Sequence, residues 1–90
     1  MDLEGLRKKI DALDKQLLEV LVERMKVVEQ VAVTKRKNNE EVVQKNRWQD
    51  LINSRSIWGV RAGLPEQEVK QIFECIHDIS VQRQKEILGQ

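Results

Sequence analysis

A single helical stretch without a break, from about Leu3 to Lys37, most constrains the fold of this chain. No Gly or Pro lies between Leu6 and Asn38. The segment is rich in Leu, Lys, Glu, Gln and Arg, which lose little side-chain entropy in a helix. Mostly apolar residues recur along it at steps of three and four: Leu3, Leu6, Ile10, Leu13, Leu17, Val20, Val27, Val31 and Thr34. The pattern predicts one continuous helix.

The length of this helix sets the architecture. At about 1.5 Å per residue, roughly 35 residues form a rod of about 50 Å. A compact chain of 90 residues has a radius of gyration of only about 12 Å. The remaining residues do not suffice to cover so long an apolar stripe, and a second copy is the simplest cover. We therefore predict a helical homodimer.

The rest of the chain predicts two shorter helices. The polar segment 36–41 contains two adjacent asparagines and is typical of a loop. A second helix is expected over 42–58, and Gly59 begins the next loop. Pro65 is expected as the first residue of a third helix over 65–88. The apolar face of that helix is predicted to contain Val69, Ile72, Phe73, Ile76 and Ile79. The predicted fold class is all-α.

Composition excludes several classes of protein and favours a single domain over 1–90. Lys and Arg number 16 against 15 acidic residues, so no bulk charge attracts nucleic acid or an anionic membrane. No run of 18 apolar residues and no signal-peptide pattern is present, and we expect a cytoplasmic protein. The single cysteine excludes an internal disulfide, and no Cys and His cluster predicts a metal site. No cofactor is expected.

Two cations occupy the apolar face of the long helix. Arg24 interrupts the stripe between Val20 and Val27, where a charge is costly unless it is paired. Lys35 lies eleven residues later on the same face. In one interpretation Arg24 pairs with a carboxylate of a neighbouring helix, and Lys35 is solvated near the helix end. In the other, both cations line one groove.

Three further polar residues fit the groove. Arg47 lies in the stripe of the second helix, and Ser80 and Gln84, one turn apart, extend the apolar face of the third. Each one alone also fits a surface position or the frayed end of a stripe. Together with Arg24 and Lys35 they predict a pocket for a small anion. Arg binds carboxylates through a planar fork, and Lys offers a compact charge.

The remaining reactive and aromatic side chains are interpreted as structural. His77, the only histidine, has no evident nucleophile or metal partner and is predicted to be a surface or satisfied helix residue. Cys75 is predicted to be an inert, partly buried thiol. Trp48 and Trp58 are predicted to be packing residues. The sequence contains no recognisable catalytic triad, phosphate loop or metal motif.

The long helix also resembles a known family. The segment LRKKIDALDKQLLEVLVERMKVVEQVAVTK, residues 6–35, closely resembles the first helix of the all-helical chorismate mutases, with the pattern LRxxIDxLDxxLLxLLxeR and Lys eleven residues later. Arg47, Ser80 and Gln84 fall at the spacings of that family. The resemblance implies a dimer in which three helices from each chain intertwine. It also implies an isomerase that converts chorismate to prephenate without metal or cofactor.

The resemblance also implies roles for individual residues. Lys35 and Gln84 would donate to the ether oxygen of the substrate, and Arg24 would bind its carboxylates. Ser80 would orient the carboxylate or hydroxyl region, and Arg47 would assist Arg24 or brace the pocket. All five would serve the site of their own chain.

Arg7 would enter the site of the partner chain. It lies 17 residues before Arg24, about 25 Å along the helix and about 100° around it. That geometry prevents Arg7 and Arg24 of one chain from serving the same pocket. Another subunit must supply Arg7.

Two positions depart from the family pattern, in a region that helps to hold the substrate hydroxyl. Gln44 stands where an acidic residue is frequent, and Trp48 where Glu is frequent. We expect weaker activity, or a hydroxyl held by backbone groups or by Gln44. Two alternatives stay open: an isochorismate pyruvate lyase of the same fold, or a non-catalytic regulatory module. Members of this family are often fused to other enzymes of aromatic amino-acid synthesis, so fusion to or association with such an enzyme is also expected.

Overall fold

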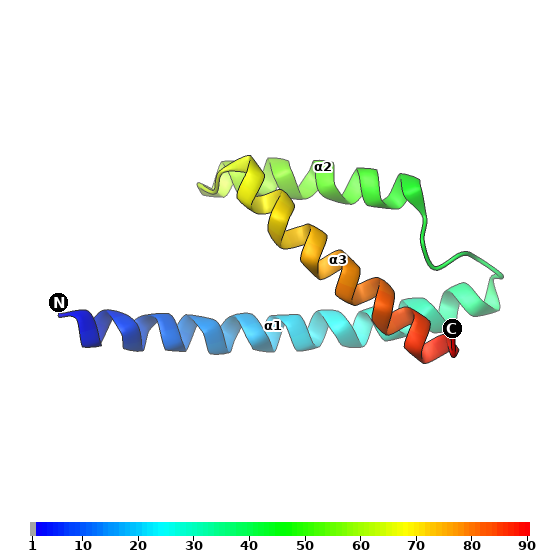
Figure 1. The fold of residues 1–90 in the computed structure, drawn as a ribbon, viewed down its shortest axis with the longest axis horizontal. Helices are drawn as coiled ribbons and strands as arrows, with labels where there is room; N and C mark the ends of the chain where they lie inside the picture. The colour runs from blue at the N-terminus through cyan, green and yellow to red at the C-terminus, as the bar shows by residue number, and fades with distance from the viewer. Residues whose placement is uncertain (1) are drawn as a thin grey trace.

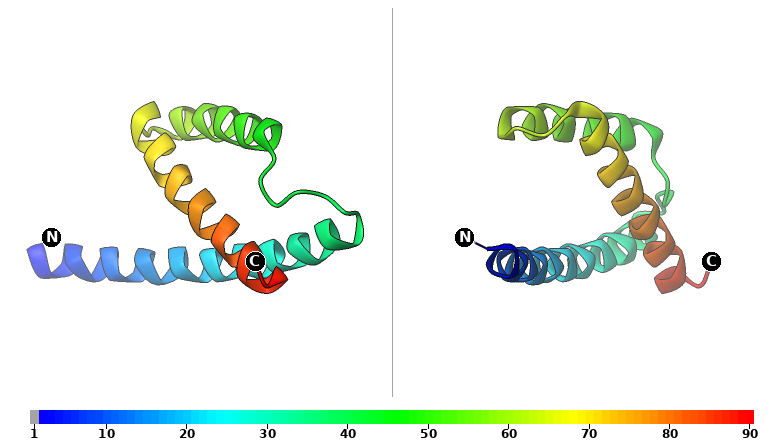
Figure 2. Two further views of the ribbon diagram at one scale, coloured as in Figure 1. Left: turned by 45° about the vertical axis from the view of Figure 1, so that its right-hand side comes forward. Right: turned by 60° about the vertical axis from the view of Figure 1, so that its left-hand side comes forward.

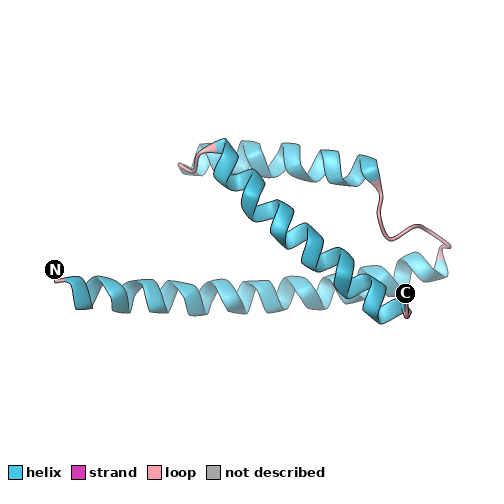
Figure 3. Cartoon of the chain, in the orientation of Figure 1, coloured by secondary structure: helices cyan, strands magenta, loops and turns pink. Residues whose placement is uncertain are grey.

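The computed structural model describes residues 2–90, which form three helices and no strand (Figure 3). These helices are α1 (Leu3–Lys37), α2 (Lys45–Ala62) and α3 (Glu66–Leu88). The predicted all-α class is confirmed, and so is the continuous first helix.

Local features of the chain explain where α1 begins and where it ends. The Asp2 side chain caps the first turn by accepting a hydrogen bond from the Gly5 N–H at 2.8 Å. At the other end Asn39 adopts the left-handed conformation, with φ of 57°, which Asn tolerates better than most residues. The Glu40 N–H then donates to the Lys35 carbonyl at 2.8 Å and closes the helix. The chain therefore turns away from the helix axis immediately after α1, and this turn is bonded to the backbone of Lys35.

The predicted bounds of the second helix were wrong at both ends. The helix begins at Lys45, three residues later than expected, because the preceding residues form an extended connection whose Val42 carbonyl binds Lys35. It continues through Gly59 to Ala62 and ends where Gly63 adopts a φ of 110°. Gly59 is therefore part of the helix and not of the loop.

Two predictions about the third helix, those for Pro65 and Cys75, needed correction. Pro65 has an extended backbone (φ −60°, ψ 141°) and precedes the helix, so it is not the first helical residue. Within the predicted apolar face, Val69 is buried, but Ile72 and Ile79 are about half exposed. Cys75 is exposed, not partly buried. In this single chain α3 therefore has uncovered apolar surface.

The three helices form an open arrangement. α3 runs diagonally from α2 to the C-terminal half of α1 and packs against both, while α1 and α2 do not pack against each other (Figures 1 and 2). The connection 38–44 spans the gap between the end of α1 and the start of α2. The N-terminal half of α1 extends beyond the other two helices.

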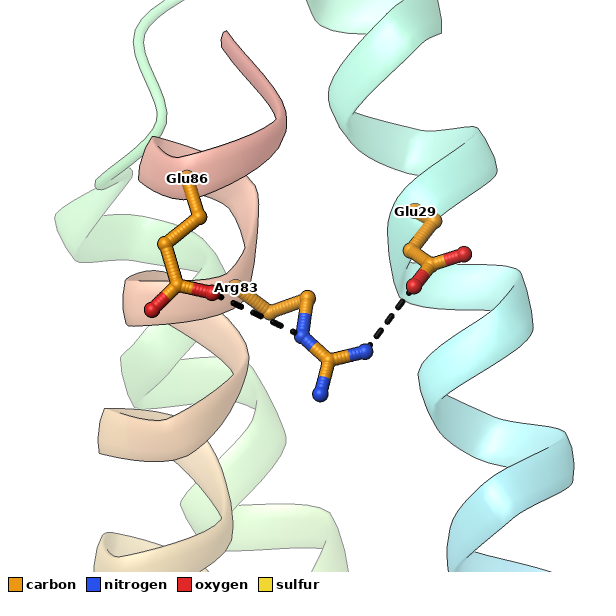
Figure 4. Close-up of polar contacts among 3 residues, drawn as sticks. All are labelled: Glu29, Arg83 and Glu86. Atoms are coloured by element: carbon orange, nitrogen blue, oxygen red, sulfur yellow. Dashed lines mark hydrogen bonds and ion pairs between the residues drawn. The ribbon is translucent and has the colours of Figure 1, made fainter. Parts of the chain in front are cut away.

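An ion pair joins α1 to α3 near the C-terminus. Arg83 Nη1 lies 2.9 Å from Glu29 Oε1, and Arg83 Nε lies 3.9 Å from Glu86 Oε2 (Figure 4). Because both Arg83 and Glu29 are about 40% exposed, such a pair contributes at most about 1 kcal/mol to stability. It serves mainly to orient α3 on α1.

The buried core of the single chain is very small. Among residues 2–90, five apolar residues are buried: Ala32, Val42, Leu51, Ile52 and Val69. The stripe on the N-terminal half of α1 is exposed, including Leu13 at 62% and Val20 at 64%. The described residues measure 54 × 24 × 15 Å with a radius of gyration of 16.1 Å, above the value of about 12 Å for a compact chain of this length.

Candidate active site

A cavity of about 510 Å³ lies where the C-terminal half of α1, the connection 38–44, α2 and α3 face one another. Its α1 wall is the continuation of the apolar stripe, including Val27, Val28 and Val31. Six of the seven predicted site residues line it: Arg24, Lys35, Gln44, Arg47, Ser80 and Gln84. A cavity of this size accommodates a small organic anion.

Arg24 is held by a hydroxyl group and not by a carboxylate. Its Nη1 donates to Ser80 Oγ at 2.7 Å, and this hydroxyl donates in turn to the Ile76 carbonyl at 2.7 Å. Ser80 is buried, so the guanidinium is fixed in direction while its charge stays uncompensated by this partner. The expectation that Arg24 pairs with a carboxylate of a neighbouring helix is not met.

The side chain of Lys35 links the connection 38–44 to α3. Its Nζ donates to the Val42 carbonyl at 2.7 Å and to Gln84 Oε1 at 2.9 Å. Burial is the main cause that lowers the pKa of Lys35 below its ordinary 10.5; Arg47 also lowers it, and Glu40 opposes the shift. Lys35 is therefore a positioned donor, not a solvated lysine at a helix end.

Several positive charges lie at or near the cavity. Burial and then the charges of Arg55 and Arg47 lower the pKa of Arg24 below its ordinary value. Arg55 was missed in the sequence. Its guanidinium lies 4.6 Å from the ring centre of Trp58 and 5.9 Å from that of Phe73, which fixes it by cation–π contacts. Such a concentration of cations produces a positive electrostatic potential, which attracts anions.

Of the two remaining predicted site residues, Gln44 lines the cavity and Arg7 does not. Gln44 lies at the cavity wall, and its Nε2 donates to the Glu41 carbonyl at 3.2 Å. Arg7 is exposed on the N-terminal half of α1 and does not line the cavity of its own chain.

The sequence analysis did not place His77 in the cavity wall. His77 lines the cavity, half-buried, and its ring stacks on Trp48 with centroids 4.4 Å apart. The spacing of 77, 80 and 84 places His77 on the same face of α3 as the two predicted residues. That spacing was the available signal. The prediction that His77 is a surface or satisfied helix residue was therefore incomplete.

Two other features bear on the kind of site. Within residues 2–90, no three His, Cys, Asp or Glu side chains gather in a way that would hold a metal ion. None of α1, α2 and α3 is both long and apolar enough to cross a membrane.

The fold and the cavity define an all-helical domain whose cavity is lined by Arg and Lys side chains and by uncharged polar groups. Comparison with known families gives a more specific assignment. Residues 6–85 match the family described as chorismate mutase type II, and the chain belongs to this family.

Two curated relatives are similar over nearly the whole chain. A bifunctional chorismate mutase/prephenate dehydratase of Buchnera aphidicola subsp. Schizaphis graminum (strain Sg) is 30% identical over 88 residues, 98% of this chain and 23% of the relative. The protein of that name from Buchnera aphidicola subsp. Acyrthosiphon pisum (strain APS) is 28% identical over 82 residues, 91% of this chain and 21% of the relative. The chain thus spans less than a quarter of the length of either relative.

Proposed function

We propose that this domain catalyses the rearrangement of chorismate to prephenate. The observation that carries the proposal is the Lys35–Gln84 hydrogen bond in a cavity with Arg24 and Arg47. An ammonium group has three N–H donors, and two are used by Val42 and Gln84. The third N–H of Lys35 and the amide N–H groups of Gln84 are therefore free to bind one substrate oxygen.

The reaction requires little acid–base chemistry. It is an intramolecular pericyclic step, in which the bond to the ether oxygen breaks as a carbon–carbon bond forms in the same molecule. A protein accelerates it by holding the dianion folded, with the enolpyruvyl group over the ring. It also stabilises the negative charge that develops on the ether oxygen, through donors already in place.

Each proposed role follows from these requirements. Lys35 and Gln84 donate to the ether oxygen, and the guanidinium of Arg24, fixed by Ser80, binds a carboxylate. Arg47 has no hydrogen bond within residues 2–90 and is free to turn toward the same end of the substrate. Gln44 lies at the wall on which the substrate hydroxyl is expected.

The proposal includes an intertwined homodimer in which Arg7 of the partner subunit completes each site. The support is the exposed stripe on the N-terminal half of α1 and the very small core of one chain. A second copy would bury that stripe and would also place a cation near an otherwise open cavity. In this proposal each chain contributes one mutase domain over 1–90. The names of the two relatives support fusion of this domain to, or its association with, a further enzyme.

Loss of chorismate absorbance on addition of purified protein, with prephenate identified as the product, tests the proposal. Arg24→Ala is expected to abolish turnover, and Arg61→Ala, a change at an exposed arginine of α2, provides the matched control. Absence of turnover by a folded wild-type dimer would refute the proposal. Release of pyruvate from isochorismate would instead identify a lyase.

A further inference from the structure

The cavity wall contributed by α3 includes one polar side chain without a role in the proposed reaction. His77 precedes Ser80 by three residues and Gln84 by seven, so the three share one helix face. The imidazole is half-buried and forms no hydrogen bond within residues 2–90. It is therefore a free polar group at the site.

Trp48 fixes the imidazole in place. The two rings lie 4.4 Å apart with an angle of 30° between their planes, and they connect α2 to α3 at the cavity. Such an aromatic contact restricts the imidazole to one orientation. His77 is thus presented to the cavity by a partner on another helix, in the way that a ligand-binding group is held by its supporting residues.

The cavity has an excess of donors and few free acceptors. Arg24, Arg47 and Lys35 only donate, and the oxygens of Ser80 and Gln84 already accept hydrogen bonds from Arg24 and Lys35. The side chains of Gln30, Thr34 and Glu40 are exposed. The half-buried acceptors that remain are the imidazole of His77 and the side-chain oxygen of Gln44, and the imidazole is the one held by a ring stack.

Burial, assisted by nearby cations, favours the neutral form of the imidazole. Arg24 and Lys35 face it from α1, Arg47 lines the same cavity from α2, Glu40 lines it from the connection 38–44, and Asp78 is adjacent on α3. Burial lowers the pKa of His77 below 6.5, as do Arg24 and Lys35, and Asp78 opposes the shift. At pH 7 one ring nitrogen is therefore an acceptor.

We propose that His77, oriented by Trp48, accepts a hydrogen bond from the ring hydroxyl of the substrate and thereby selects for a hydroxylated ring. This inference rests on the proposed mutase function and adds a residue that determines specificity. Trp48 acts as a positioning residue through the imidazole. A protonated imidazole loses the acceptor, so binding weakens as the pH falls through the pKa of His77.

The test measures kcat/KM for chorismate between pH 5 and 8 in the wild type, His77→Leu and His77→Gln. An unpaired hydroxyl is expected to reduce kcat/KM about tenfold in His77→Leu at pH 7. His77→Gln, which retains an acceptor that does not titrate, should recover most of the activity and lose the acidic decline. With a substrate whose ring hydroxyl is methylated, wild type and His77→Leu should differ by less than about twofold, because the donor is absent.

Two further measurements separate this role from packing. The chain has one histidine, so its imidazole NMR signals report its pKa directly, and this pKa should coincide with the acidic decline of kcat/KM. In Trp48→Ala the imidazole becomes more exposed to water. The pKa measured by NMR and the pH midpoint of the acidic decline of kcat/KM should then rise together toward 6.5.

The outcomes distinguish the two proposals. No turnover of chorismate by the wild type would refute the mutase function, and this inference with it. Turnover by the wild type with an unchanged rate and pH profile in His77→Leu would overturn the role of His77 alone. A tenfold loss in Gln44→Leu, without one in His77→Leu, would assign the hydroxyl to Gln44 and also overturn it.

Discussion

The ammonium group of Lys35 joins α1 to the connection 38–44 and to α3 at the cavity. Its side chain binds Val42 and Gln84, and its own carbonyl accepts from Glu40, so the connection 38–44 is closed at two points on one residue. The face shared by Arg24 and Lys35 could be predicted from sequence spacing. The closure of the connection 38–44 onto Lys35 could not be predicted, because it depends on the position of the Val42 carbonyl in the folded chain.

Replacing Lys35 should therefore separate charge from shape. Lys35→Ala is expected to lower turnover by at least about two orders of magnitude, since a donor at developing charge contributes about 3 to 4 kcal/mol. Lys35→Gln retains an N–H that can reach Val42 and should lose nearly as much turnover if the charge is decisive. Turnover by purified protein and elution as a dimer are the measurements, with Lys37→Ala, at an exposed lysine of the same helix, as the control. Near-normal turnover by Lys35→Ala would contradict the proposal that Lys35 donates to the ether oxygen of the substrate.

The lowered pKa of Lys35 predicts a decline of activity in alkaline solution. The charged form is the donor, so kcat/KM should fall as pH rises through the pKa of Lys35, which lies below 10.5 in the free protein. Lys35→Arg should retain some activity and shift this decline to higher pH, because arginine stays protonated. A pH profile of both proteins to pH 10.5 is sufficient. An identical alkaline decline in the two would assign it to another group.

At the scale of helices, local sequence signals located α1 well and α2 poorly. The absence of Gly and Pro predicted α1, and Asn39 in its left-handed turn ends it. The connection before α2 is held by the hydrogen bond from Lys35 to Val42, and Gly59 within α2 packs closely against Val69 of α3. Both determinants are distant in sequence, so periodicity within one segment does not contain them.

Close packing at Gly59 predicts that a larger side chain destabilises the fold. A Cβ at this position would overlap one methyl group of Val69 and lie 3.1 Å from the other. Gly59→Ala is therefore expected to lower the free energy of unfolding by about 1 to 3 kcal/mol, despite the better helix propensity of Ala. Urea unfolding measures it, and Asn53→Ala, at an exposed position of α2, should be neutral or slightly stabilising. A stabilising Gly59→Ala would mean that α2 and α3 move apart at no cost.

At the scale of the whole molecule, two features of one chain support the proposed dimer. The apolar stripe on the N-terminal half of α1 is exposed, and Arg7 does not line the cavity of its own chain. The length of α1 made the uncovered stripe predictable, since a rod of about 50 Å exceeds a compact chain of this size. The side on which a second copy binds depends on surface shape, which periodicity alone does not specify.

Mixing two inactive variants tests whether a second copy supplies Arg7. Arg7→Ala and Arg24→Ala should each be inactive. A mixed dimer, however, contains one site with Arg24 intact and Arg7 intact on the partner subunit. Random reassortment after unfolding and refolding makes half of the dimers mixed, each with one working site, so about a quarter of wild-type activity should return.

The two variants refolded separately provide the control, and size-exclusion chromatography with light scattering checks that all samples are dimers. If Arg7 instead acted within its own chain, every site of the mixture would lack one of the two arginines. No activity would then return. Recovery of about a quarter of wild-type activity therefore requires that α1 of one chain, which is too long to be covered by its own chain, extends into the site of the partner subunit.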